Sequence, residues 1–262
     1  MSAKYFQLKS FFTYWLDAVD EHSLHSPFLF DFFTRVLKKE FSHPDFEALA
    51  RSRQKLATDH RVINITDFGS GSLKMKSPSR KISDIASISV TPEKYSRLYT
   101  RIIRHYNCKH ILELGTSLGL NTLYLAKAQE GIRVATIEGS VETAQVAKKM
   151  LDEHGAKNVQ LILGNIDQAL PTYLSGSEKI DFAFIDANHR RGPTLNYFEL
   201  ILEKTHDETV VVLDDIHYSK EMEEAWQQIQ AHKRVFTSID LYRCGLTFFN
   251  PALTKQNAVL QF

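Results

Sequence analysis

The chain has 262 residues, of which 43% are hydrophobic and 24% are charged. This composition is typical of a globular protein and excludes a mainly disordered or fibrous chain. Its 32 lysines and arginines nearly balance 31 aspartates and glutamates, so no overall field would attract a polyanion or a lipid surface. We therefore expect neither nucleic acid nor a membrane among its partners.

The two cysteines, Cys108 and Cys244, lie far apart in the sequence and form no Cys-x-x-Cys motif. Neither a disulfide framework nor a structural zinc site is supported. The aromatic N-terminus is interrupted by Lys4, Lys9 and Asp17, and no apolar run of about 20 residues follows it. These features predict a cytoplasmic protein.

Residues 1–90 are predicted to form a helical extension. Apolar residues recur there at helical spacing in two stripes, and Ser26 and Pro27 mark the start of the second helix. The stripes are Phe12, Trp15, Leu16 and Val19, and then Leu29, Phe32, Phe33, Val36 and Leu37. Such stripes need a partner surface. The partner surface is either the rest of the chain or a second subunit of a homodimer. Alternatively, the stripes cover an active site.

Residues 91–262 alternate short apolar runs with segments of helical period, which is typical of β-α-β units around a parallel sheet. The last two runs flank Arg243, Cys244 and Gly245 and predict an antiparallel hairpin. The predicted strands are His110 to Gly115, Arg133 to Glu138, Val159 to Leu163, Ile180 to Ile185, Thr209 to Leu213, Val235 to Tyr242 and Leu246 to Phe249. We predict an α/β domain with a doubly wound, mostly parallel, seven-stranded sheet that ends in this hairpin.

Two glycine turns compete as a nucleotide site, one with Gly69 and Gly71 and one with Gly115 and Gly119. A nucleotide-binding turn places backbone N–H groups and a helix N-terminus close to the ligand. The segment after Gly71 is basic and is a poor helix start, so we interpret it as a solvated loop or as a lid over an acidic substrate. Its basic residues are Lys74, Lys76, Arg80 and Lys81. The segment after Gly119 is amphipathic, which favours the second turn.

The chemistry of the second turn favours an adenosyl ligand. Glu138 ends the following strand about 20 residues after the turn, where a carboxylate accepts hydrogen bonds from both ribose hydroxyls. The turn itself reads Glu113-x-Gly115-x-x-x-Gly119 and lacks the middle glycine that brings the backbone against a pyrophosphate. This absence disfavours a dinucleotide and therefore a nicotinamide-dependent reductase.

The ordered set of segment 113–119, Glu138 and Asp186 resembles the class I S-adenosylmethionine-dependent methyltransferases. Within them it is similar to the branch of the catechol and caffeoyl-CoA O-methyltransferases. The resemblance covers residues 91–262 and implies that the glycine turn faces the methionine part, Glu138 holds the ribose and the turn at 164–167 lies near the adenine. The cofactor-binding residues it implies are Glu113, Gly115, Thr116, Ser117, Gly119, Glu138, Gly139, Asn165 and Asp186.

Three carboxylates are expected at one edge of the sheet. Asp186 follows the fourth parallel strand, while Asp214 and Asp215 follow the fifth, with His189 and His217 close behind. Three carboxylates at the ligand-binding edge repel one another unless something positive joins them. Mg²⁺ suits carboxylate and water ligands, so Asp186, Asp214 and Asp215 are candidate metal ligands.

The resemblance supports a metal role for Asp186 and Asp214. Asp215, however, stands where the family commonly has Asn, and His189 stands where it has a catalytic Lys. We take His189 as a candidate base and Asp186 as the second candidate catalytic residue. Two simpler interpretations stay open, because Asp214 or Asp215 could cap the following helix, and His217 fits a packing residue better than a ligand.

The resemblance implies an enzyme that methylates an oxygen of a small-molecule acceptor, with S-adenosylmethionine as the donor and with or without Mg²⁺. One alternative is a methyltransferase-fold protein that binds or assembles without catalysis. Another is a metal-independent N- or C-methyltransferase.

Overall fold

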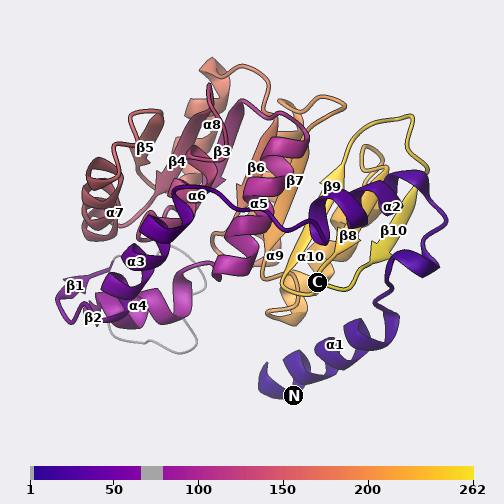
Figure 1. Ribbon diagram of the computed structural model, residues 1–262, viewed down its shortest axis with the longest axis horizontal. Coiled ribbons are helices and arrows are strands. Elements are labelled where there is room, and N and C mark those ends of the chain that lie inside the picture. The colour runs from indigo at the N-terminus through magenta and orange to yellow at the C-terminus, as the bar shows by residue number, and fades with distance from the viewer. Residues whose placement is uncertain (1–2, 66–78) are drawn as a thin grey trace. The chain divides into compact units, whose positions relative to one another are not determined.

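The computed structural model describes residues 3–65 and 79–262. The chain divides into two compact units. Unit 1 combines residues 1–39 with residues 177–262, and unit 2 comprises residues 40–176. Figure 1 shows the helices and strands of both units. None of the helices within the described ranges has the length and apolar character needed to cross a membrane.

Unit 2 is built on three parallel strands. β3 (His110–Leu114) pairs with β4 (Arg133–Glu138), and β4 pairs with β5 (Val159–Leu163). A separate antiparallel pair is formed by β1 (Val62–Asn64) and β2 (Ser79–Lys81). The helices of this unit are α3 (Phe46–Ala57), α4 (Ile82–Ser89), α5 (Glu93–His105), α6 (Leu120–Ala126), α7 (Val141–Glu153) and α8 (Ile166–Gly176).

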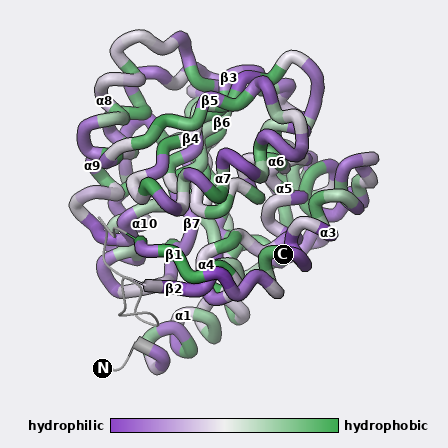
Figure 2. Tube along the Cα trace, turned by 90° about the vertical axis from the view of Figure 1, so that its left-hand side faces the viewer, coloured by the Kyte–Doolittle hydropathy of each residue, from purple (hydrophilic) through white to green (hydrophobic). Residues whose placement is uncertain are grey.

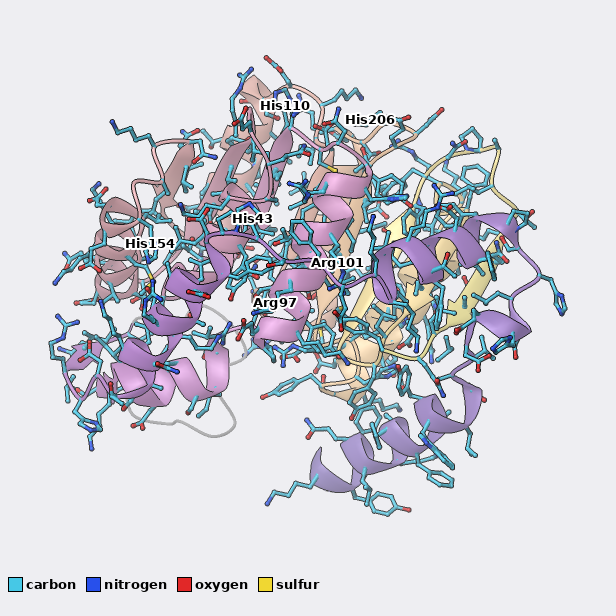
Figure 3. The ribbon with its side chains drawn as sticks, in the orientation of Figure 1. His43, Arg97, Arg101, His110, His154 and His206 are labelled. Carbon is cyan, nitrogen blue, oxygen red and sulfur yellow. The ribbon has the colours of Figure 1, made fainter. Side chains whose placement is uncertain are left out.

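The helices of unit 2 are held by apolar faces and by a few specific polar contacts. The apolar stripe of α5 is buried, as its helical spacing predicts. Ser52 on α3 has its Oγ 2.8 Å from Nε2 of His154, and the guanidinium of Arg97 lies 4.7 Å from the ring centre of Phe46. Figure 3 labels His154 and also Arg97 and Arg101, which lie one turn apart on α5. Helix α3 is therefore an integral part of this unit.

Unit 1 contains five strands in the order β10-β8-β9-β7-β6. β6 and β7 are parallel, β9 runs antiparallel to both of its neighbours, and β10 is parallel to β8. The strands are β6 (Phe182–Ile185), β7 (Val210–Asp214), β8 (Thr237–Asp240), β9 (Cys244–Phe248) and β10 (Gln256–Val259). The helical segments are α1 (Ala3–Asp17), the 3₁₀ turn η1 (Glu21–Ser23), α2 (Pro27–Phe32), the π-helical turn η2 (Phe33–Leu37), α9 (Arg191–Leu202) and α10 (Lys220–Ala231).

The predicted fold class is confirmed, with one correction in the number of strands. The five parallel strands and the β8–β9 hairpin lie where the sequence predicts them. Within the described residues the main strands number eight instead of seven, because β10 adds to the edge of β8. This segment, Gln-Asn-Ala-Val, contains only one strongly β-forming residue, so its extended conformation depends on pairing with β8 and not on local preference.

Helices cover both faces of the strands in unit 1. Gly245 and Phe248 on β9 are three residues apart and therefore face opposite sides of the strand. A Cβ at Gly245 would lie 2.6 Å from the Trp226 ring on α10, so that face is in close contact with α10. On the other face, Phe28 and Phe32 of α2 pack edge-on against Phe248.

The two aromatic stripes of the N-terminal region have different environments. The second, on α2 and η2, is buried inside unit 1. The first lies on α1, where Phe12 is 57% exposed and Trp15 is 61% exposed, and Figure 2 shows hydrophobic and hydrophilic residues alternating along this helix. α1 is anchored by its other side, since Tyr14 Oη donates to the Leu260 carbonyl at 2.7 Å. A homodimer and a domain boundary at residue 90 stay predictions.

The turn between β3 and α6 depends on glycine. Gly115 and Gly119 have φ of 98° and 80°, a left-handed conformation that residues with a Cβ avoid. A Cβ at Gly119 would lie 3.1 Å from both Cα and Cβ of Ala147 on α7. Glycine at 119 therefore permits both the turn and the close packing of α6 on α7.

We predict that Gly119→Ala destabilises the protein more than Gly155→Ala does. Gly155 also has a positive φ, 62°, but a Cβ there meets nothing within 4 Å, so its substitution carries only the left-handed strain of about 1–2 kcal/mol. Gly119→Ala carries a similar strain plus an overpacking cost of about 1–3 kcal/mol. Urea unfolding of both variants and the wild type measures the difference, and equal losses would contradict the packing argument.

Candidate active site

Unit 2 carries its predicted cofactor residues at the carboxyl ends of β3, β4 and β5. Gly115 and Ser117 follow β3, Gly139 follows β4, and Asn165 follows β5. Gly115 N donates to the Ile137 carbonyl at 3.0 Å, which ties the turn to the end of β4. Asn165 Oδ1 accepts from Asp167 N at 3.0 Å at the start of α8. The structure therefore brings these residues to one edge, as parallel strands require.

Glu138 is hydrogen-bonded to the backbone on both sides. Its Oε2 accepts from Ser117 N and its Oε1 accepts from Ser140 N, each at 2.9 Å. The carboxylate thus links the glycine turn to the start of α7, where Ser140 is the N-cap residue. Two backbone N–H groups therefore fix the orientation of this partly exposed carboxylate.

Glu113 lies beneath the turn and not on its surface. Its side chain is fully buried, and it accepts from Asn121 Nδ2 at 2.9 Å, from Thr136 Oγ1 at 2.7 Å and from Thr122 Oγ1. Thr116 is also buried, with its hydroxyl 2.6 Å from that of Thr136. Glu113 and Thr116 therefore support the turn from below, whereas Gly115 and Ser117 are partly exposed.

Burial raises the pKa of Glu113 to about 7. The hydrogen bonds from Thr122, Thr136 and Asn121 favour the charged form and lower the pKa, but they do not offset the loss of hydration, and the nearby charge of Glu138 raises it further. The carboxyl group therefore changes charge near neutral pH.

Unit 1 carries the second group of predicted site residues at the ends of β6 and β7. Asp186 follows β6, and His189 Nε2 lies 3.5 Å from its Oδ1. The backbone is strained here, because Asn188, His189 and Asp215 have φ of 68°, 48° and 53°. Strained backbone at non-glycine residues is typical of functional sites, and it orients the side chains at this edge.

Arg243 is the positive group that joins the carboxylates. Because Asp214 pairs with Cys244 in the antiparallel β7–β9 register, Arg243 is placed beside it. Its Nη2 lies 2.7 Å from Asp214 Oδ2, its Nε lies 3.2 Å from Oδ1, and Nη2 lies 3.7 Å from Asp215 Oδ1. This is a bidentate ion pair to a fully buried carboxylate.

The ion pair holds Arg243 in its charged form. Burial by itself lowers the pKa of Arg243, but the charges of Asp214 and Asp215 outweigh it and raise the pKa above its ordinary value. Burial, followed by the charges of Asp186 and Asp215, raises the pKa of Asp214, and Arg243 counteracts that rise. The two groups therefore depend on each other for their charges.

The carboxylates do not fit a divalent ion in this arrangement. Both oxygens of Asp214 are engaged by Arg243, and a cation in the same place would be repelled by the guanidinium. Across residues 3–65 and 79–262, no group of three or more His, Cys, Asp or Glu side chains is placed to hold a metal. A metal role for Asp186, Asp214 and Asp215 therefore finds no support in the geometry.

The other predicted roles at this edge are also resolved. The cap of α10 is Ser219, whose Oγ accepts from Met222 N at 3.2 Å, so neither Asp214 nor Asp215 performs it. The ring of His217 bridges Glu223 and Asp240 at 3.1 and 2.8 Å and is a packing residue. Burial lowers the pKa of His217, but both carboxylates raise it and dominate.

Sequence reasoning missed Arg243 because the signal lay in strand pairing. Arg243 belongs to a predicted hairpin turn, and only the β7–β9 register brings it to Asp214. The predicted lid residues Lys74 and Lys76 lie outside the described residues, while Arg80 and Lys81 belong to β2.

We predict that Glu113→Gln makes stability less dependent on pH. Because the folded-state pKa of about 7 lies above the ordinary 4.5, this group stabilises the fold fully below about pH 4.5, and that contribution is lost as the pH rises through 7. Between pH 5 and pH 8 the wild type should lose on the order of 3 kcal/mol of unfolding free energy through this group. Glutamine does not titrate, so Glu113→Gln should lack this loss. Urea unfolding at pH 5 and pH 8 measures it, with the exposed Glu130→Gln as control. The same loss in Glu113→Gln and wild type would contradict the pKa shift.

Comparisons with known proteins agree with this geometry. Residues 112–216 match a family described as "Methyltransferase domain". The chain is 29% identical over 165 residues to a catechol O-methyltransferase of Niastella koreensis, covering 61% of this chain and 72% of that protein. It is 27% identical to the O-methyltransferase imqG of Aspergillus flavus, over 53% of this chain and 57% of that protein.

A solved structure gives the same result. The O-methyltransferase TomG from Streptomyces achromogenes, in complex with S-adenosylmethionine, is 25% identical and superimposes with a TM-score of 0.55, covering 62% of this chain and 82% of that chain. The matched segment 112–216 contains the glycine turn, Glu138 and the carboxylates after β6 and β7. The chain is therefore similar to S-adenosylmethionine-dependent methyltransferases, and among them to the O-methyltransferases.

Proposed function

We propose that the chain transfers a methyl group from S-adenosylmethionine to a hydroxyl oxygen of a small molecule. The observation that carries the proposal is the Glu138 carboxylate at the end of β4, held by Ser117 N and Ser140 N at 2.9 Å each. In that position the carboxylate is oriented by two backbone contacts before any ligand arrives. A preorganised carboxylate is what a ribose with two hydroxyls requires.

The surrounding residues supply the rest of the cofactor site. We assign the turn from Gly115 to Ser117 to the methionine part, because its left-handed residues leave the backbone accessible. Gly139 would face the ribose of the bound cofactor, and Asn165 would face its adenine. Glu113, Thr116 and Gly119 act as support, since they fix the turn from below or from the α6–α7 contact.

The small-molecule acceptor rests on similarity. The chain resembles proteins named as catechol O-methyltransferase and as O-methyltransferases, and its net charge of +1 provides no field for a polyanionic substrate. The identity of the oxygen compound is set by side chains around the acceptor, for which the matched motifs carry no information.

The residues of unit 1 then perform the proton chemistry. S-adenosylmethionine, when bound, supplies a methyl group on a positively charged sulfur. An acceptor hydroxyl must lose its proton, and we assign its acceptance to Nδ1 of His189, because Nε2 faces Asp186 at 3.5 Å. Asp186 orients the ring, while the protein positions both reactants and excludes water.

We predict that Glu138→Gln weakens binding of S-adenosylhomocysteine, the demethylated product, by about 10- to 100-fold, because hydrogen bonds to a charged acceptor contribute about 1.5–3 kcal/mol. Isothermal titration calorimetry measures the affinity. Glu130→Gln is the matched control, since Glu130 is exposed in the same unit. Absence of any binding heat in the wild-type protein would refute the proposed function.

We predict that His189→Ala lowers turnover on the order of 100-fold or more, the usual effect of removing a general base, while the affinity for S-adenosylhomocysteine changes little. Turnover is followed as S-adenosylhomocysteine formed from a panel of hydroxylated compounds. His25→Ala is the control, because His25 is exposed and belongs to the same unit. Equal losses in turnover and in affinity would assign His189 a structural role instead.

A further inference from the structure

Three carboxylates lie at the ends of β6 and β7 in unit 1, and their negative charges require a counter-charge. Asp186, Asp214 and Asp215 lie close enough for their charges to interact, and Asp214 has no exposed side-chain surface. Buried carboxylates without a counter-charge are strongly destabilising. A divalent ion is one candidate that the sequence offers for this place.

The guanidinium of Arg243 lies directly against two of these carboxylates. It contacts both oxygens of Asp214 at 3.2 and 2.7 Å and lies 3.7 Å from Asp215. A bidentate fork to a carboxylate is the preferred geometry of arginine. A metal ion bound here would either displace the guanidinium or place a second positive charge beside it in the same partly buried space.

The backbone holds Arg243 in place on both sides. Ile216 N, next to Asp215, donates to the Arg243 carbonyl at 3.2 Å, and Arg243 N donates to the Leu241 carbonyl at 2.8 Å. Tyr242, the preceding residue, has a φ of 66° and its N–H donates to Asp240 Oδ1 at 2.7 Å. The tight turn before β9 therefore delivers the guanidinium to Asp214 as part of the fold.

We propose that Arg243 replaces the divalent ion at this carboxylate edge, so that the chain neither binds nor requires a metal there. The proposal deepens the proposed function, on which it rests for its catalytic meaning. A guanidinium neutralises carboxylates, but it has no vacant coordination position and cannot activate a hydroxyl as a metal does. Proton removal then depends on a side chain, which is the role assigned to His189. Arg243 is a positioning residue that holds Asp214 and Asp215 in their charged arrangement.

Titration with Mn²⁺, followed by the electron paramagnetic resonance signal of the free ion, tests the proposal on the full chain. The wild-type protein should leave the signal unchanged. Arg243→Ala removes the counter-charge of Asp214 and Asp215, whose carboxylates suit a hard divalent ion, so it should bind one Mn²⁺ at least about tenfold more tightly than wild type. Adding Asp214→Asn to Arg243→Ala should abolish that binding.

Two outcomes would overturn the proposal. One is wild-type binding of a single Mn²⁺ that Asp214→Asn removes. The other is a folded Arg243→Ala protein that binds none, because the carboxylates would then form no cation site. Arg243→Ala leaves Asp214 buried without its counter-charge, which can prevent folding. In that case, Mn²⁺ titration of the wild type and of Asp214→Asn still tests the proposal.

A parallel measurement separates this proposal from the proposed function. The affinity of wild-type protein for S-adenosylhomocysteine should change less than twofold, about the error of such a titration, when EDTA is added. Absence of binding with and without EDTA would refute the methyltransferase function and leave the Mn²⁺ result valid. Binding that EDTA abolishes would instead overturn the replacement of the metal by Arg243.

Discussion

Two carboxylates, Glu113 in unit 2 and Asp214 in unit 1, are fully buried where a parallel strand ends. Such groups must be neutralised or paired, because their hydration is lost on folding. Glu113 is surrounded by neutral donors, and its pKa rises to about 7. Asp214 is paired with a guanidinium instead. The same physical constraint therefore gives a titrating support under the glycine turn and an ion pair at the carboxylate edge.

The environment of each acid determines its role. Glu138 is partly exposed, and each of its oxygens accepts a backbone N–H, so it stabilises the turn while remaining accessible to a ligand. Glu113, only two residues before Gly115, has no exposed surface and stabilises the turn from within. In unit 1, Asp186 is 14% exposed beside His189, whereas Asp214 is inaccessible. The partly exposed acids are thus accessible to ligands, whereas the buried acids stabilise the backbone and side chains around them.

Strand pairing explains how a hairpin residue becomes part of the candidate site. β9 is antiparallel to β7, so the turn before β9 lies at the carboxyl end of β7. Any side chain in that turn is delivered to the edge where parallel strands place their ligand-binding residues. In this chain the side chain is Arg243, and its single positive charge reduces the repulsion between Asp214 and Asp215.

The sequence by itself determined the strands of the parallel region, the glycine turn and the order of the acids, because helical and strand periodicity and turn chemistry are local properties. It did not reveal β10, whose conformation comes from pairing with β8. It also did not reveal the burial of Glu113 or the contact between Arg243 and Asp214, which join residues 29 positions apart. Counter-charge, burial and register are properties of neighbours in space, and only the tertiary structure decides them.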